Sequence, residues 1–464
     1  MSNVQNVILD HVVIDSATDM GINGTIVTTF SMFDSTFRHA GNMAGEGGIY
    51  IRELLGPYGF SGDNHIFNST IEGSHDFNVR IVNTTATGSE PDFLSVEDST
   101  IQNVTSNTGV GLQAAAQGNA NLRLSVSGSN FVDNGAVGAQ MDADTNAVGD
   151  LRLQTSTFNA TQPGGTNQKS ALKLFAAGSS TIYFNVHDNA TIVCEDKILH
   201  FDGRDLATLN GFVRRNTIEP ATDNNSTAIV FETCNSAAGV VKLDGNSIQK
   251  PTGEIDDRPI GMVLAASDGT ASLDATVVNN SIDSHAANFG THGMYFDSGS
   301  GSQGESPRLC ADIAGNAINV PVGATMLTQY SGTTFQIQGL TPPAGATAEQ
   351  VHDYVTALNS GVQTQVVTYN GCIVNYTAAD CQTPSVPVLP TVNTSAFGVD
   401  AEVLEPFAQP PRAELPAAVE KEETALIVDV PESGDAAQIS NSPWTSHLAR
   451  RSRLISANCP HLSW

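Results

Sequence analysis

The stretch LRLSVSGSNFVDNG, residues 122–135, contains the unit that decides the fold. Apolar and polar residues alternate from Leu122 to Ser127, as they do in a strand that buries one face. Two small polar residues and one large apolar residue follow at 129–131, and the turn-forming residues 133–135 end the stretch. The stretch therefore predicts a strand, a corner, a second short strand and another corner.

The tripeptide at 129–131 recurs along the chain with its apolar member every 26 to 36 residues, about 31 on average. Its ten copies are Ser35-Thr36-Phe37, Ser69-Thr70-Ile71, Ser99-Thr100-Ile101, Ser129-Asn130-Phe131, Ser156-Thr157-Phe158, Ala190-Thr191-Ile192, Asn216-Thr217-Ile218, Asn246-Ser247-Ile248, Asn280-Ser281-Ile282 and Asn316-Ala317-Ile318. Self-similarity at such a period is typical of a solenoid.

Each period contains three strand-like pieces that are too short to bury themselves. Each piece must pair with its counterpart one period later, which stacks parallel strands about 4.8 Å apart. We therefore predict an all-β, right-handed parallel β-helix of about ten or eleven coils over residues 1–340. Like apolar side chains should stack inside it, and the corner Asn, Ser and Thr side chains should hydrogen-bond one another and the turn backbone. Leucine-rich repeats and propeller blades fit this period less well.

Residues 341–381 are predicted to close the C-terminal end of the solenoid. Thr347 and Gln350 form a capping-box pattern at the start of a short helix. Its apolar residues are spaced for one helical face: Val351, Tyr354, Val355 and Leu358. A lid on the open end is the favoured interpretation, and a helix that binds a partner is the alternative.

Residues 382–464 are predicted to be a disordered, proline-rich, acidic linker or tail. Nine prolines lie between residues 382 and 443, and the chain turns basic near its end. A tether to a further module and an altered gene end both fit this change. The first residues do not resemble a signal peptide, and we expect the sequence to be part of a longer polypeptide.

The charge of the chain excludes some partners. It carries 48 acidic and 20 basic side chains, a formal net charge of −28, so nucleic acid and anionic membranes would repel it. Because no segment approaches the ~20 apolar residues of a membrane helix, we expect no membrane insertion. The acidic, Gly- and Asn-rich composition favours an extracellular or cell-surface location.

The six cysteines show no metal-binding spacing. Cys194, Cys234 and Cys310 lie in apolar strand-like settings and are expected to be buried thiols. Cys372 and Cys381 are nine residues apart, and both a local disulfide and two separate thiols fit that spacing.

A family resemblance rests on three strings, residues 69–74, 124–131 and 310–318. They resemble coils of bacterial right-handed parallel β-helix repeat proteins, which include surface adhesin-like proteins and enzymes of the pectate-lyase-like fold. The resemblance covers about residues 4–340. It implies the fold, but it does not choose between adhesion and catalysis, because both occur on this scaffold.

Two groups of charged residues are the catalytic candidates. Asp256 and Asp257 are adjacent acids, and a hydrolase of this fold would need paired carboxylates. Asp202, Arg204 and Asp205 would suit a lyase, which needs a basic residue beside acids. Our favoured interpretation of Asp202 and the 256–257 pair is that they are turn residues.

Asp142 and Asp144 are the candidate calcium ligands, and no other cofactor is predicted. We therefore expect a non-enzymatic secreted or cell-surface repeat protein, a structural stalk or adhesin-like molecule that contacts a glycan or another cell-surface ligand. The alternative is a carbohydrate-active enzyme, a polysaccharide lyase or glycoside hydrolase, or a glycan-binding domain.

Overall fold

The structure is a computed structural model of the 464-residue chain. It describes residues 1–56, 64–85, 91–159, 170–194, 196–220, 227–249, 260–283, 293–301, 304–319, 325–330, 332–340, 344–361, 364–368, 376–378 and 380–387. Asp256 and Asp257 lie outside the described residues, and so does Cys372.

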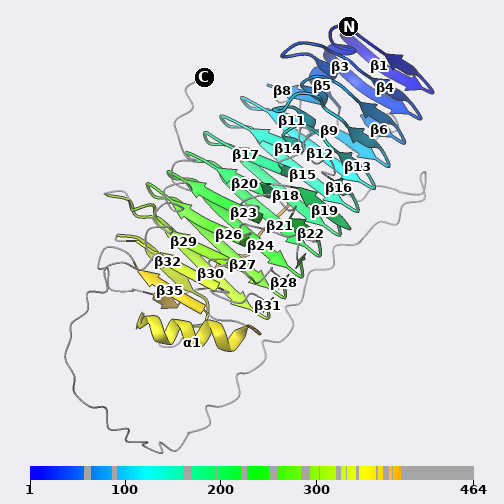
Figure 1. Ribbon diagram of the computed structural model, residues 1–464. Helices are drawn as coiled ribbons and strands as arrows, with labels where there is room; N and C mark the ends of the chain where they lie inside the picture. The colour runs from blue at the N-terminus through cyan, green and yellow to red at the C-terminus, as the bar shows by residue number, and fades with distance from the viewer. Residues whose placement is uncertain are drawn as a thin grey trace, which may run out of the picture. The chain divides into compact units, whose positions relative to one another are not determined.

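The described strands form a parallel β-helix with three ladders, which we call sheets A, B and C (Figure 1). Sheet A contains β3 (Ile22–Phe33), β5 (Gly47–Leu55), β8 (Phe77–Asn83), β11 (Val110–Ala116), β14 (Val137–Ala143), β17 (Ser170–Ala176), β20 (Lys197–Gly203), β23 (Thr227–Cys234), β26 (Ile260–Ser267), β29 (Met294–Ser298), β32 (Thr325–Gln329) and β35 (Thr364–Thr368). Sheet B contains β6 (His65–Phe67), β9 (Asp92–Glu97), β12 (Asn121–Ser127), β15 (Val148–Gln154), β18 (Thr181–His187), β21 (Thr208–Arg214), β24 (Ala238–Asp244), β27 (Ser272–Val278), β30 (Arg308–Ala314), β33 (Thr334–Ile337) and β36 (Tyr376–Ala378). Sheet C contains β2 (Val13–Asp15), β4 (Thr36–Arg38), β7 (Thr70–Glu72), β10 (Thr100–Gln102), β13 (Asn130–Val132), β16 (Thr157–Asn159), β19 (Thr191–Cys194), β22 (Thr217–Pro220), β25 (Ser247–Ile248), β28 (Ser281–Asp283) and β31 (Ala317–Asn319).

About nine turns are complete, because the turns from β5–β7 to β29–β31 each give a separate strand to all three sheets. At the N-terminal end the long strands β1 (Ser2–Asp10) and β3 pair along their lengths, and the last residues of β3 also pair with β6. At the other end β34 (Ala344–Ala346) adds an antiparallel contact to β36. The predicted parallel β-helix is confirmed, and the prediction of ten or eleven coils also counted the incomplete end turns.

The apolar member of each tripeptide lies in the core of the solenoid. Sheet C places these residues in register from one turn to the next, as in the pair Ile101 and Phe131. The rings of Phe131 and Phe158 stack with their centroids 4.6 Å apart and 6° from parallel. The whole series from Phe37 to Ile318 is buried. Burying one large apolar side chain contributes about 2 kcal/mol to the stability of the fold. This explains why all ten tripeptides have Phe or Ile at this position.

The polar residues at one corner form a continuous hydrogen-bond ladder. The backbone N–H of each member donates to the side chain of the member one turn later, as Ser69 does to Ser99 Oγ (3.1 Å) and Asn216 to Asn246 Oδ1 (3.1 Å). We call this series the corner ladder: Ser35, Ser69, Ser99, Ser129, Ser156, Asn189, Asn216, Asn246, Asn280, Asn316 and Asn359. The prediction that corner side chains bond one another and the turn backbone is confirmed.

The helix α1 (Ala348–Leu358) lies at the C-terminal end of the stack (Figure 1). Thr347 accepts from the backbone of Gln350, whose side chain accepts from the Thr347 N–H, so the predicted capping box is present. Val351 and Val355 are buried in the solenoid core. Among the described residues no helix is long and apolar enough to cross a membrane.

Two expectations about the cysteines are wrong. Cys310 is not a thiol but forms a disulfide with Cys381, 71 residues later, so Cys381 does not pair with its near neighbour in the sequence. Cys234 is also disulfide-bonded. Cys194 is buried, as predicted. The sequence could not reveal these pairings, because a disulfide depends on which side chains the fold brings within bonding distance.

Candidate functional site

Charged side chains gather on the outward face of sheet A, on strands β14 to β29. In-register positions form two neighbouring rows along the solenoid. One row contains Asp142, Phe175, Asp202, Glu232, Ala265 and Asp297, and the other contains Gln113, Gln140, Lys173, His200, Val230, Val263 and Tyr295. Adjacent strands are about 4.8 Å apart, so a side chain in either row lies beside its counterparts in the turns before and after it. We call this surface the charged row, and we include in it Lys197 at the start of β20 and Arg204 just after its end, because both pair with acids of the surface.

Asp202 and Arg204 form the centre of the charged row. Arg204 donates from both Nε and Nη2 to the Asp202 carboxylate, with Nη2 2.8 Å from Oδ2. The guanidinium also lies over the Phe175 ring, 5.4 Å from its centroid. Burial lowers the pKa of Arg204, but Asp202 outweighs burial and the pKa is raised, so this cation stays charged. The structure thus brings together two of the candidates from the sequence.

The interpretation of Asp202 as a turn residue is wrong. It lies inside β20, on the outward face, and its side chain is 4% exposed. The turn begins after Gly203, and there Asp205 has a positive φ and accepts a hydrogen bond from Asn235 (3.2 Å). Asp205 is therefore a corner residue and lies outside the ion pair of Asp202 and Arg204.

Glu232 is the register partner of Asp202 in the next turn, and it is not among the candidates predicted from the sequence. Lys197 Nζ lies 3.3 Å from Glu232 Oε1, and His200 Nε2 lies 3.8 Å from Oε2. Burial by itself raises the pKa of Glu232, but His200 and Lys197 outweigh it and hold the pKa below its ordinary value. Glu232 is therefore a buried carboxylate that two basic side chains keep ionised. Aligning the repeats on their tripeptides would have placed Glu232 beside Asp202.

Asp142 lies in the row of Asp202, two turns before it. Amides rather than cations donate hydrogen bonds to its carboxylate. Gln113 and Gln140 donate to it at 2.7 and 2.8 Å, while burial raises its pKa. Asp144 is exposed and accepts from the Thr145 backbone (2.6 Å). Groups of three potential ligands whose donor atoms lie within 4.8 Å of one another occur twice among the described residues, and neither group includes Asp142 or Asp144.

Asp297 is the last residue in the row of Asp202 and Glu232, and as a residue it is 2% exposed. Burial raises its pKa well above the ordinary value, and the charge of Glu305 raises it further. Its Oδ1 accepts no hydrogen bond from the described part of the chain. The surface therefore contains one acid whose pKa is lowered, Glu232, and one whose pKa is raised, Asp297.

Access to the charged row is through its basic members. The side chains of Asp202 and Glu232 are each 4% exposed, whereas Lys197 is 22% and Arg204 17% exposed. A ligand that approaches sheet A therefore meets N–H donors and the Phe175 ring before it meets a carboxylate. Such a surface suits a ligand rich in hydroxyl and carboxylate oxygens.

Comparison with protein-family models, with curated proteins and with solved structures finds no match to this chain.

Proposed function

We propose that this chain is a non-enzymatic, secreted or cell-surface repeat protein, a rigid stalk that presents the charged row to a glycan or another cell-surface ligand. The observation that supports this most directly is the pairing of Asp202 and Glu232 with basic side chains. Each carboxylate is held in an ion pair by its own basic side chain, which suits a preorganised binding surface better than proton transfer.

Glycan binding follows from the chemistry of the exposed groups. The cations Lys197 and Arg204 are already oriented by their carboxylates, so they lose little conformational freedom when they bind a ligand. Oxygen-rich polymers offer acceptors at regular intervals, and the row offers donors in successive turns. The continuous corner ladder supports the role of a rigid stalk, because it joins every turn from Ser35 to Asn359.

Calorimetry with a panel of neutral and acidic polysaccharides tests the proposal. We expect an acidic polysaccharide to bind and Arg204→Ala to weaken its binding about tenfold or more, since a charge-assisted contact is lost. Arg215→Ala is the matched control, because Arg215 pairs with Asp188 (2.7 Å) at a corner outside the row. Equal loss in both variants, or binding by no polysaccharide in the panel, would contradict the proposal.

A carbohydrate-active enzyme is the second candidate, and one observation favours it. Asp202 and Glu232 occupy register positions about one strand spacing apart, near the 5–5.5 Å that separates the carboxyl groups of retaining glycosidases. Release of reducing or unsaturated sugar ends, abolished by Glu232→Gln, would establish this alternative and overturn the first proposal. Calcium at Asp142 and Asp144 remains a proposal, which calcium titration of Asp142→Asn would test.

A further inference from the structure

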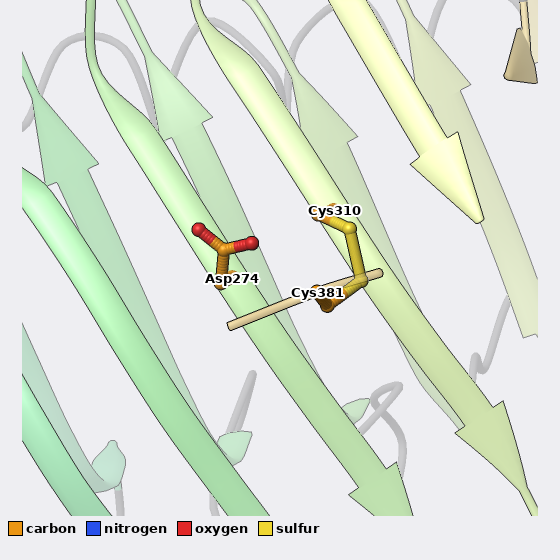
Figure 2. Close-up of side chains that lie close together, drawn as sticks. All are labelled: Asp274, Cys310 and Cys381. Atoms are coloured by element: carbon orange, nitrogen blue, oxygen red, sulfur yellow. A yellow bond between two sulfur atoms is a disulfide. The ribbon is translucent and has the colours of Figure 1, made fainter. Parts of the chain in front are cut away.

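Residues 381–387 form an extended segment, here called the strap, that lies along the outward face of sheet B. The sequence predicts that residue 381 ends the cap region and that a disordered tail begins at residue 382. Instead Cys381 is joined to Cys310 on β30, and Figure 2 shows this disulfide beside Asp274 of the neighbouring strand β27. All three of these residues are buried. The disulfide therefore fixes one end of the strap to the solenoid.

The strap is held by hydrogen bonds to every second turn of the solenoid. Its N–H groups donate to Gln338 Oε1 from Cys381 (3.0 Å), to Asp274 Oδ1 from Gln382 (3.1 Å) and to Asn210 Oδ1 from Ser385 (3.0 Å). Gln338 directly follows β33, Asp274 lies in β27 and Asn210 lies in β21. The strap therefore crosses the strands of sheet B and runs back toward the N-terminal turns.

The far end of the strap reaches a buried charge cluster. Arg152 Nη2 donates to the Pro387 carbonyl oxygen (2.8 Å). The same guanidinium pairs with Asp150, which also pairs with Arg123 (2.8 Å). The side chains of these three residues are between 4% and 9% exposed. The cluster thus recognises the strap through its backbone carbonyl.

The spacing of the strap matches the spacing of the turns. Asp274 and Asn210 occupy the same register position two strands apart, which is about 9.6 Å. They bind the N–H groups of residues 382 and 385, which are three residues apart. Three residues of polyproline II helix rise about 9.3 Å, and prolines stand three apart at Pro384 and Pro387. One turn of polyproline II therefore spans two turns of the solenoid.

We propose that the outward face of sheet B is a polyproline II recognition surface for the strap, and that the Cys310–Cys381 disulfide is a thiol-sensitive latch that keeps the strap in place. A dithiol attacks the S–S bond as its thiolate and forms a mixed disulfide. Its second thiol then displaces the protein sulfur, so that two protein thiols and one cyclic disulfide result. The strap is then held by its hydrogen bonds alone, and its release uncovers Asp274, Asn210 and the Arg123–Asp150–Arg152 cluster.

Linkage between the hydrogen bonds and the disulfide gives a quantitative test. The full chain is equilibrated in graded buffers of reduced and oxidised dithiol, and peptide-resolved alkylation reports Cys310 and Cys381 separately from Cys234. Gln382→Pro keeps the φ of polyproline II but removes the N–H that Asp274 accepts. We expect it to favour the reduced form about tenfold or more, and Ser385→Pro to favour it about two- to tenfold.

The strap also offers matched controls. No described residue accepts a hydrogen bond from the N–H of Thr383 or Val386, so Thr383→Pro and Val386→Pro should change the equilibrium less than twofold. If the control variants shift the equilibrium as far as Gln382→Pro and Ser385→Pro do, the solenoid does not bind the strap through the N–H groups of residues 382 and 385. Asn210→Ala should match Ser385→Pro, and the double variant should add nothing further.

Hydrogen exchange of the full chain tests the latch itself. We expect reduction to accelerate exchange of the amides of residues 382 and 385, while the amides of β21 and β27 stay protected. Unchanged exchange of the strap after complete reduction of Cys310–Cys381 would overturn the role of the disulfide as a latch.

Discussion

The N-terminal and C-terminal halves of the corner ladder bond the backbone N–H groups of one corner with different side chains, serine in the first half and asparagine in the second. From Ser35 to Ser156 each hydroxyl accepts one N–H from the previous turn and donates to a carbonyl two residues earlier in its own turn, as Ser99 does to Glu97 (2.8 Å). From Asn189 to Asn359 each amide NH₂ reaches a carbonyl of the previous turn, as Asn246 does to Val213 (2.8 Å). Among the described serines of the ladder, only Ser99 and Ser129 make this contact, at 3.5 and 3.3 Å.

The two halves differ in how many turns the hydrogen bonds of one ladder side chain connect. Asn246 accepts from both the N–H and the NH₂ of Asn216, and it donates to Val213 and to Asn280. The side chain of one asparagine therefore bonds to groups in the turns before and after its own, whereas the side chain of a serine bonds, within the described part of the chain, only to groups in its own turn and the previous one. We expect the asparagine half to depend more strongly on each ladder residue, because more buried groups lose a partner when one is removed.

The largest effect is expected from Asn246→Ala. The change leaves the Asn216 N–H and the Val213 carbonyl buried without their partner, which should lower the free energy of unfolding by roughly 3–5 kcal/mol. Equilibrium urea unfolding measures it. A loss below about 1 kcal/mol would mean that the turns are held by core packing alone.

An intermediate loss of stability is expected from Asn246→Ser, which places in the asparagine half the residue type that the serine half uses. The hydroxyl can still accept the Asn216 N–H, but it should reach the Val213 carbonyl only by a long contact, as Ser129 does with Val96 (3.3 Å). The bond from the Asn246 NH₂ to Asn280 is lost altogether. We expect a loss of about 2 kcal/mol, measured by the same unfolding curves. Equal stability of Asn246→Ser and the parent would remove the distinction between the two halves.

A smaller effect is expected from Ser99→Ala in the serine half. The Ser69 N–H loses its acceptor, and we expect a loss of about 1 kcal/mol. Unfolding of Ser99→Ala beside Asn246→Ala compares the two halves directly. The comparison fails if the serine variant is the less stable of the two.

The smallest effect concerns the corner where serine gives way to asparagine. Asp188 precedes Asn189 there, and hydrogen bonds from Arg215 and His187 lower its pKa to about 2. Because the ionised carboxylate is favoured in the folded chain, its contribution to stability is present above pH ~3.8 and is lost as pH falls toward 2. NMR titration should find this low pKa, and Arg215→Ala should return it toward 3.8. An unchanged pKa in Arg215→Ala would show that Arg215 is not its cause.

The fold can be predicted from the repeat because each tripeptide is a short local pattern and occurs ten times in the sequence. The tripeptide fixed the register of sheet C, the core position of Phe131 and its equivalents, and the corner ladder. The capping box at Thr347 likewise needs only four residues. Asp202 and Arg204 can be found as candidates because they are close in sequence. Glu232 cannot, because it meets Asp202 and Lys197 only through the stacking of turns.

The sequence by itself therefore determined the period, the three strands of each turn, the stacked core and the cap, since periodicity and capping are properties of short segments. Only the tertiary structure decided which outward side chains form the charged row, which cysteine pairs with Cys310, and where residues 381–387 lie. These features depend on distances between residues 30 to more than 200 positions apart. No local pattern encodes such distances, because they arise only when the turns have stacked in register.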